Sequence, residues 1–290
     1  MKGFIRFSTI VIALLILEGV SACKSVPAPV PSLALVFRGI EADDPSLLKL
    51  LFTLEAEGQA SSDSVKILSW QALAEGRQAE AAFSLDYTTG KLPQGAISIE
   101  SSIPLMLKTD VTALAAMGLA PRDNYNITLI IELDYSQVSR KPIPSKRLEV
   151  RGLAVFPGVQ MPEFIITEIA VLKAELVNTR FRVALKIDNP NPFPIELSAF
   201  SYELYGNGRL WADGIEKNII SVNGKSSLTG NLFLIMNFIN MKRDLLDQII
   251  RLEDVNYRFS GDAQVNTKVE YLPKFNYGFD LSGYSQVLEK

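Results

Sequence analysis

The chain has 290 residues, a formal net charge of −3, a single cysteine and no histidine. It is long enough for two domains of ordinary size, each with its own hydrophobic core. The missing histidine and the lone cysteine exclude zinc fingers, Ser-His-Asp triads, Cys-His nucleophiles and any disulfide within one chain. Without a basic excess, nucleic acid is not an expected partner. We expect no catalytic residues, no metal site and no cofactor.

A secretory signal is expected at the N-terminus, where Lys2 and Arg6 precede an apolar run and small residues lead to Cys23. This ending resembles a bacterial lipobox. The resemblance implies that residues 1–22 are removed, that Cys23 is acylated and that a membrane is the partner there. Lys24 stands where an aspartate would retain a lipoprotein in the inner membrane, which implies the outer membrane, facing the periplasm. An uncleaved anchor helix with a bystander cysteine is the alternative, although the apolar run is shorter than the ~20 residues a span needs.

Residues 23–32 contain alternating prolines and are expected to form a stiff, extended tether. Beyond them, shifting the chain by about 130 residues superimposes much of it on itself, which predicts two copies of one unit. In both copies the inward phase of a strand slips by one residue, which predicts a β-bulge. The matched residues are Phe52 with Val183, Leu54 with Leu185, Ile67 with Ala199, Glu75 with Asn207 and Asp110 with Asn240.

Each copy is expected to contain one amphipathic helix that covers its core. The first follows an N-cap at Asp110 and uses Leu114 and Ala115, and the second runs from Met241 to Leu252. The first helix is rich in alanine where the second carries larger apolar residues. Any apolar cavity is therefore expected beneath the first helix, although backbone collapse should close most of it.

Several local features are expected to be structural. Asn223-Gly224 predicts a tight hairpin, and Trp70 and Trp211 are expected to fill sheet cores. The basic segment from Arg140 to Arg147 is expected to be a solvated hairpin end, with a docking patch for acidic head groups as the alternative.

The most informative stretch runs from Phe181 to Tyr205. Apolar residues alternate up to Ile187, which predicts a half-buried strand, and a second strand starts at Ile195. Between them lies Asn189-Pro190-Asn191-Pro192-Phe193-Pro194. Its three prolines have no N–H group and hold φ near the extended value, so the segment must leave the strand ladder.

This Asn-Pro-Asn segment between two apolar strands resembles the type 2 late-embryogenesis-abundant proteins, whose module is the water-stress-and-hypersensitive-response (WHy) domain. The resemblance covers roughly residues 161–281. It implies a small antiparallel β-sandwich with one helix and a role in desiccation or general stress protection, and it brings no catalytic residues. Asn189 and Asn191 are interpreted as structural groups that bond backbone left unpaired by the prolines, with ligand binding as the alternative.

We therefore expect a mainly β protein of two tandem immunoglobulin- or fibronectin-like antiparallel β-sandwiches, each with one α-helix. The divisions are a signal peptide at 1–22, a tether at 23–32, a divergent WHy-like sandwich at 33–156, a linker at 157–162 and a WHy-type sandwich at 163–285. The expected role is that of a non-catalytic, membrane-anchored lipoprotein of the cell envelope, for stress or desiccation protection or for structural binding, with protein clients or lipid as possible partners. The alternative is a periplasmic carrier or tether for a lipid or other apolar ligand. The sequence does not indicate an oligomeric state.

Overall fold

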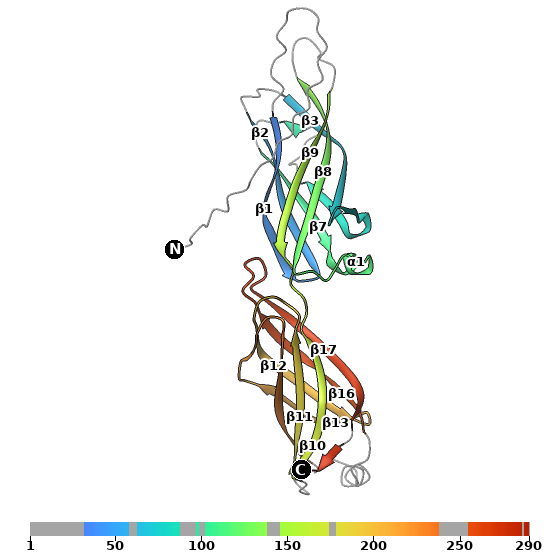
Figure 1. Ribbon diagram of the computed structural model, residues 1–290, viewed down its shortest axis with the longest axis vertical. Helices are drawn as coiled ribbons and strands as arrows, with labels where there is room; N and C mark the ends of the chain where they lie inside the picture. Colours follow the sequence, from blue (N-terminus) through green and yellow to red (C-terminus); the bar gives the residue numbers. More distant parts are fainter. Residues whose placement is uncertain are drawn as a thin grey trace, which may run out of the picture.

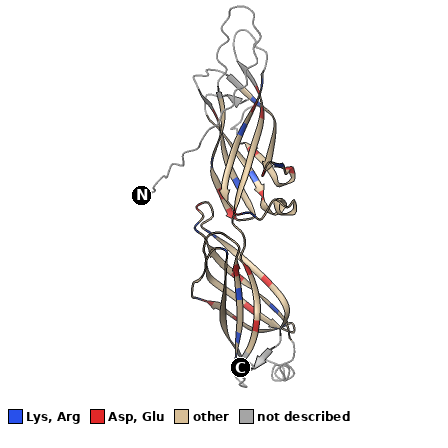
Figure 2. Ribbon diagram, viewed as in Figure 1, with Lys and Arg blue, Asp and Glu red and all other residues tan. Residues whose placement is uncertain are grey.

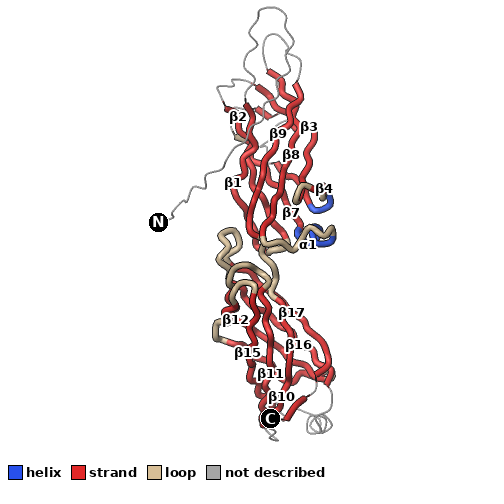
Figure 3. Tube along the Cα trace, viewed as in Figure 1, coloured by secondary structure: helices blue, strands red, loops and turns tan. Residues whose placement is uncertain are grey.

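The computed structural model describes residues 32–57, 63–87, 97–98, 102–137, 146–173, 178–237, 255–285 and 287–289 (Figure 1). These residues are mainly β, which confirms the predicted class. The chain is arranged as two halves that follow one another along the long axis (Figure 1). Figure 3 shows strands throughout both halves, with loops gathered where the halves meet.

The first half contains nine strands among its described residues, together with the 3₁₀-helix η1 (Glu80–Ala82) and the α-helix α1 (Val111–Ala116). The strands are β1 Ser32–Asp44, β2 Leu47–Glu57, β3 Asp63–Ala74, β4 Arg77–Gln78, β5 Phe83–Tyr87, β6 Ile97–Ser98, β7 Ile103–Asp110, β8 Asn124–Gln137 and β9 Lys146–Pro157.

The described part of the second half also contains nine strands. They are β10 Glu163–Lys173, β11 Asn178–Asn189, β12 Ile195–Gly206, β13 Arg209–Glu216, β14 Ile220–Val222, β15 Ser226–Asn237, β16 Val255–Asn266, β17 Lys274–Ser285 and β18 Val287–Glu289. The last of these lies beyond the predicted limit of the second sandwich, and it pairs in parallel with β10. Sequence reasoning did not predict β18.

The two halves share one strand order. The first has a sheet β1-β2-β7-β5 and a sheet β4-β3-β8-β9, in which β6 also pairs with β3. The second has a sheet β15-β11-β10-β18 and a sheet β13-β12-β16-β17, in which β14 also pairs with β12. The trio β1-β2-β7 thus corresponds to β10-β11-β15, and β4-β3-β8-β9 corresponds to β13-β12-β16-β17.

Each half has its own cluster of buried hydrophobic side chains, drawn from strands of both of its sheets. Period-2 alternation produces these clusters because successive side chains of a strand point to opposite faces. On β8, Ile127, Leu129 and Ile131 are fully buried, as the alternation predicts. On β11, Phe181 and Val183 are fully buried in the same way.

The predicted phase slips are confirmed as register shifts. The pairing of β3 with β8 shifts between Ile67 and Ser69, and the pairing of β12 with β16 shifts between Ser198 and Ser201. Ala199 has a φ of 50° at this point. This left-handed conformation is uncommon for a residue with a side chain and marks the extra residue of the bulge.

The predicted paired turns are also present. Glu75 and Asn207 begin two-residue turns with φ of 52° and 49°, each followed by a glycine with positive φ. Positive φ at both central positions suits the twist of a hairpin. The Glu75 N–H donates to the Asn126 carbonyl at 2.9 Å, and the Asn207 N–H donates to the Asn256 carbonyl at 2.8 Å. Both turns therefore contact the next long strand of their sheet through a corresponding bond.

The prediction for the first helix is correct at its start and for the burial of Leu114, and wrong for Ala115. The Asp110 carboxylate accepts from the Ala113 N–H at 3.0 Å, so Asp110 is the N-cap. Leu114 is buried, but Ala115 and Ala116 are exposed, because the helix ends after six residues and turns only its Leu114 side inward. The two hollows described below, about 620 and 270 Å³ in volume, are lined by other strands and do not lie beneath α1.

Two further predictions are wrong. Asn223-Gly224 does not close a hairpin, because β14 before it pairs with β12 and β15 after it pairs with β11, in the opposite sheet. Trp211 is buried and stacks on Phe181, with ring centroids 5.5 Å apart, but Trp70 is 37% exposed. Its strand β3 pairs with β4 only at Leu73 and Ala74, so the edge beside Trp70 has no strand partner among the described residues.

Other predictions lie outside the described residues. These are the signal segment 1–22 with Cys23, nearly all of the tether, the helix from Met241 to Leu252 with its N-cap, and most of the basic segment after Arg140. β9 ends at Pro157 and β10 begins at Glu163, on either side of the predicted linker. The immunoglobulin-like character of each half and the domain limits stay predictions.

Candidate functional site at the junction of the two halves

The Asn-Pro-Asn segment connects β11 in one sheet to β12 in the other. β11 ends at Asn189, where it pairs with Ser226, and β12 begins at Ile195. The intervening prolines have no N–H group, so this crossing cannot satisfy its backbone through a strand ladder. The two asparagine side chains are buried, with 2% of Asn189 and 0% of Asn191 exposed. Buried amides of this kind need partners for each polar atom.

Both polar atoms of the Asn189 side-chain amide have hydrogen-bond partners within the second half. Its amide nitrogen lies 2.8 Å from the Phe193 carbonyl, 3.2 Å from that of Val222 and 3.0 Å from that of Asn223. Its amide oxygen accepts from both the backbone and the side-chain N–H of Asn191, each at 3.0 Å. One side chain thus joins the crossing between β11 and β12 to the turn between β14 and β15.

The Asn191 side chain reaches the segment that links the halves. Its amide nitrogen donates to the Gln160 carbonyl at 2.8 Å, and its amide oxygen accepts from the Gln160 N–H at 2.7 Å. The Asn191 carbonyl also accepts from the Lys225 N–H at 2.7 Å. Asn191 therefore fixes Gln160 in the way a neighbouring strand would, although no strand runs there.

Lys225 and Asp123 join the halves directly. The Lys225 ammonium lies 2.6 Å from the Asp123 carboxylate of the first half. The Asp123 carbonyl accepts from the Gly158 N–H at 2.9 Å, and a Cβ placed on Gly158 would lie 2.1 Å from the Arg122 carbonyl oxygen. The ion pair between Lys225 and Asp123 is solvent-exposed and contributes little to stability by itself. The close approach at Gly158 defines where the link leaves the first half.

An aromatic contact forms the other side of the junction. The Tyr271 hydroxyl donates to the Pro157 carbonyl at 2.6 Å, and its ring meets Phe156 edge-on with centroids 6.1 Å apart. Tyr271 packs against the core of the first half although it belongs to the second. Burial raises the pKa of the Tyr271 phenol well above its usual range, and the charge of Tyr125 adds a smaller rise. Tyr271 thus stays protonated and keeps its donor role.

Sequence reasoning singled out the two asparagines but missed the rest of this junction. Gln160, Lys225, Asp123 and Tyr271 carry no local pattern, and their partners lie 31 to 114 residues away along the chain. The only sequence pattern that pointed to the junction was the run of asparagines and prolines at residues 189–194. The geometry favours the structural interpretation of Asn189 over the ligand-binding one, since its amide atoms are all occupied by the protein.

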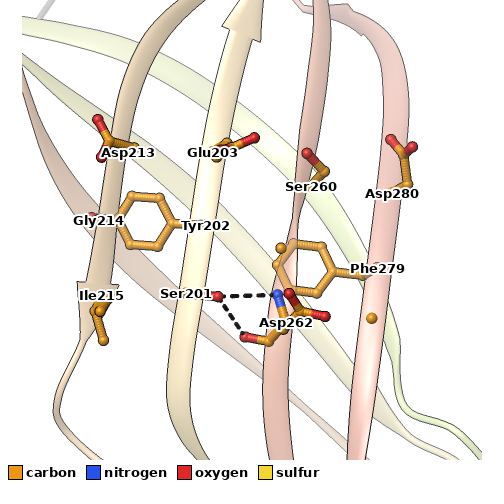
Figure 4. Close-up of a pocket in the computed structure, with 12 residues that line it drawn as sticks. Ser201, Tyr202, Glu203, Asp213, Gly214, Ile215, Ser260, Asp262, Phe279 and Asp280 are labelled. Carbon is orange, nitrogen blue, oxygen red and sulfur yellow. Dashed lines mark hydrogen bonds between the residues drawn. The ribbon is translucent and has the colours of Figure 1, made fainter.

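A second feature is a shallow hollow of about 620 Å³ on the sheet β13-β12-β16-β17 (Figure 4). Exposed Glu203, Asp213, Asp262 and Asp280 lie at it, and the Ser201 hydroxyl bonds the backbone of Asp262. The hydrogen bond from Arg258 lowers the pKa of the Asp280 carboxyl. Among the described residues, no group of acidic or sulfur side chains is arranged to hold a metal ion. The hollow offers no nucleophile paired with a base.

Charge is distributed without a single-sign field. In the view of Figure 2, lysines and arginines are interspersed with aspartates and glutamates along the strands of both halves. Several of them form cross-strand pairs, such as Lys108 with Asp86 and Arg258 with Asp280. Within the described part of the chain, no helix has the length and apolar character needed to cross a bilayer.

The fold and the junction define a mainly β protein in which two buried asparagine side chains bond backbone groups. Residues 184–272 match the model of a family described as late embryogenesis abundant protein. This match supports the type 2 late-embryogenesis-abundant family and spans the Asn-Pro-Asn crossing, β12 to β16 and Tyr271. A search of curated proteins gives no match.

Solved structures give only weak likenesses. A protein from Archaeoglobus fulgidus is 19% identical over 43% of this chain and 97% of its own, with a TM-score of 0.25. A Bacteroides uniformis beta-glucuronidase is 9% identical over 82% of this chain and 26% of its own, with a TM-score of 0.22. The secreted serine protease VesC from Vibrio cholerae is 9% identical over 70% of this chain and 46% of its own, with a TM-score of 0.21. These scores are too low to support any argument about function.

Proposed function

We propose that this protein is a non-catalytic lipoprotein of the cell envelope that protects proteins or membranes under stress. In this proposal its second half is a WHy-type β-sandwich, and its first half is a diverged copy of the same unit. The observation that carries the proposal is the family match over residues 184–272. The buried asparagines support it, because the family's polar segment is used to build the fold instead of an exposed site.

The carrier alternative has less support from the described residues. An apolar ligand needs an apolar groove or cavity of several hundred Å³. The larger hollow is open and bordered by four carboxylates, and the smaller one, about 270 Å³, is bordered by Ser69, Gln71, Glu132, Arg147 and other residues. Neither has the apolar lining that an acyl chain would require.

Anchoring is proposed from the sequence around Cys23. An acylated cysteine at the end of a proline-containing tether would hold both halves close to a membrane surface. A single acyl chain binds a bilayer only marginally, whereas several chains anchor firmly. Intact-mass analysis of the native mature chain should show Cys23 as its first residue with an acyl increment, and Cys23→Ser should release the protein from membranes. A mature chain without the increment would contradict the anchor.

Protection is tested by drying. A desiccation-sensitive dehydrogenase should retain more activity after drying with the full-length protein than with an equal mass of serum albumin. Equal recovery of dehydrogenase activity with both proteins would contradict the protective role. Saturable fatty-acid binding by the delipidated protein would support the carrier instead.

A further inference from the structure

The two halves differ in how one edge of a sheet is finished. In the first half β5 leaves the sheet of β3 and β4 and pairs with β7 in the other sheet, at Phe83 with Thr109 and Tyr87 with Leu105. In the second half the corresponding chain stays on the sheet of β12, as β13 and β14. As a result β15, the counterpart of β7, pairs only with β11 among the described residues.

The edge of β15 that is unpaired among the described residues has none of the usual protective features in its sequence. Natural edge strands carry charges, prolines or bulges that prevent pairing with another chain. Ser226–Asn237 contains no charged residue and no proline, and its twelve residues pair with β11 without any register shift. Phe233 and Ile235 are 67% and 63% exposed. By contrast, the edge strands β9 and β17 both contain charged residues.

Comparison with β7 shows that β15 lacks a charged residue found at the equivalent position of the first half. Phe52 pairs with Leu105, and its match Val183 pairs with Leu232, so Lys108 of β7 corresponds to Ile235 of β15. Lys108 is charged and pairs with Asp86 of the covering strand β5. In the second half an apolar side chain replaces that lysine, and the described residues include no strand equivalent to β5.

We infer that the free edge of β15 accepts an extended, uncharged peptide segment of another protein as an added antiparallel strand. Strand addition of this kind takes its affinity from backbone hydrogen bonds and its selectivity from alternate side chains. The occupant follows from β5, a five-residue strand with apolar residues at alternate positions, Phe83, Leu85 and Tyr87. This inference rests on the proposed protective function and names its client as exposed strand-forming segments of unfolding proteins.

The absence of charge on β15 indicates which residues the added strand should carry. A lysine or glutamate in the added strand would find no opposite charge on β15, and would lie beside the apolar side chains of Phe233 and Ile235. In the register of β5, the alternate apolar residues of an added strand lie opposite Leu232 and Leu234, and the two residues between them lie opposite Phe233 and Ile235. The binding segment should therefore be neutral at the positions that face these two residues.

The probe is a fluorescein-labelled synthetic peptide that contains Phe-Ser-Leu-Ser-Tyr, the β5 sequence with its aspartate replaced by serine. The control peptide, Phe-Pro-Leu-Pro-Tyr, keeps the apolar residues but lacks two backbone donors. Fluorescence anisotropy with the full-length protein should show saturable binding of the first peptide and roughly tenfold weaker binding of the second. Equal binding of both peptides would overturn strand addition.

Ile235→Lys restores the charge found at Lys108 and should weaken peptide binding by about tenfold or more. The matched control is Val155→Lys, since Val155 is 54% exposed on β9, in the first half of the chain. Both positions face solvent, so both variants should fold, which circular dichroism checks. Binding that survives Ile235→Lys, or that falls equally with Val155→Lys, would overturn the inference.

Three further outcomes separate the alternatives. If sedimentation shows a dimer that Ile235→Lys abolishes and that the peptide does not dissociate, the occupant is a second copy and the client inference fails. If Ile235→Lys removes peptide binding and also the protection of a dried dehydrogenase, the inference stands. Protection that persists without peptide binding leaves the proposed function intact and refutes only the role of β15.

Discussion

The Asn191 side chain and the Gln160 backbone exchange two hydrogen bonds of 2.7 and 2.8 Å, so a side-chain amide takes the place of a neighbouring strand. Gln160 lies in the short segment between β9 and β10, and Asn191 is held in turn by Asn189. The Asn-Pro-Asn segment thus stabilises the second half and also fixes the link from the first.

Asn191→Ala should destabilise the protein and loosen the link. It leaves the part-buried N–H and carbonyl of Gln160 without their partner, and we expect a total cost of about 1–3 kcal/mol because water can reach these groups in part. Chemical denaturation should show a lower free energy of unfolding. Spin labels placed on the two halves should show a broader distance distribution by electron paramagnetic resonance.

The control for this change is Asn276→Ala, at an exposed position of β17. It should change stability by less than about 0.5 kcal/mol, as surface substitutions usually do. An unaltered melting temperature and an unaltered distance distribution for Asn191→Ala would show that the Gln160 contact does not hold the link.

Gly158→Ala should lower the stability of the protein, although it adds only one methyl group. The added Cβ would lie 2.1 Å from the Arg122 carbonyl oxygen and 2.8 Å from the Tyr125 ring, so backbone must move. Overpacking of this kind costs about 1–3 kcal/mol. Gly230→Ala is the matched control, because nothing lies within 4 Å of its Cβ position. If both variants unfold at the same denaturant concentration, the approach at Gly158 is not a tight one.

Local patterns predicted much of this fold. The alternation on β8, the register shifts near Ile67 and Ala199, and the N-cap at Asp110 each depend on a few neighbouring residues, so sequence shows them. The sheet that an edge strand joins is not local: β5 has the same alternation whichever sheet it pairs with. This explains why the exposure of Trp70 and the open edge of β15 were not predicted.

The junction was missed for the same reason. Tyr271 bonds a carbonyl 114 residues away, and Lys225 pairs with an aspartate 102 residues away. Neither residue differs by type or spacing from ordinary surface residues. Only the asparagines stood out, because prolines beside them remove backbone donors and create a local demand for partners.

Substitutions in α1 should separate its buried side from its exposed side. Leu114 is fully buried, so Leu114→Ala should lower the free energy of unfolding by about 2–5 kcal/mol. Ala115 is exposed, and Ala115→Leu should be nearly neutral in both stability and fatty-acid binding. Thermal unfolding measures the first effect. A stabilising Ala115→Leu that also blocked fatty-acid binding would reveal a cavity under the helix.

Tyr271→Phe should make the stability of the protein less dependent on alkaline pH. The folded-state pKa of Tyr271 is raised from an ordinary 10.0, so the stability contributed by its protonated form is complete below about pH 10. It is lost as the pH rises from there through the folded pKa, because the unfolded chain ionises first. The loss for one such group approaches about 1.4 kcal/mol per pH unit.

At pH 8 the wild type should exceed Tyr271→Phe by about 1 kcal/mol, the usual value of one hydrogen bond such as that to Pro157. Above pH 10 this difference should shrink and then reverse, since phenylalanine cannot ionise in the unfolded chain. Tyrosines with raised pKa values that do not interact with Tyr271, such as Tyr202 and Tyr257, affect both proteins equally and cancel in the comparison. Urea unfolding at pH 8, 10 and 11 measures the difference directly. A constant difference across that range would mean that the Tyr271 hydroxyl is not held protonated at the junction.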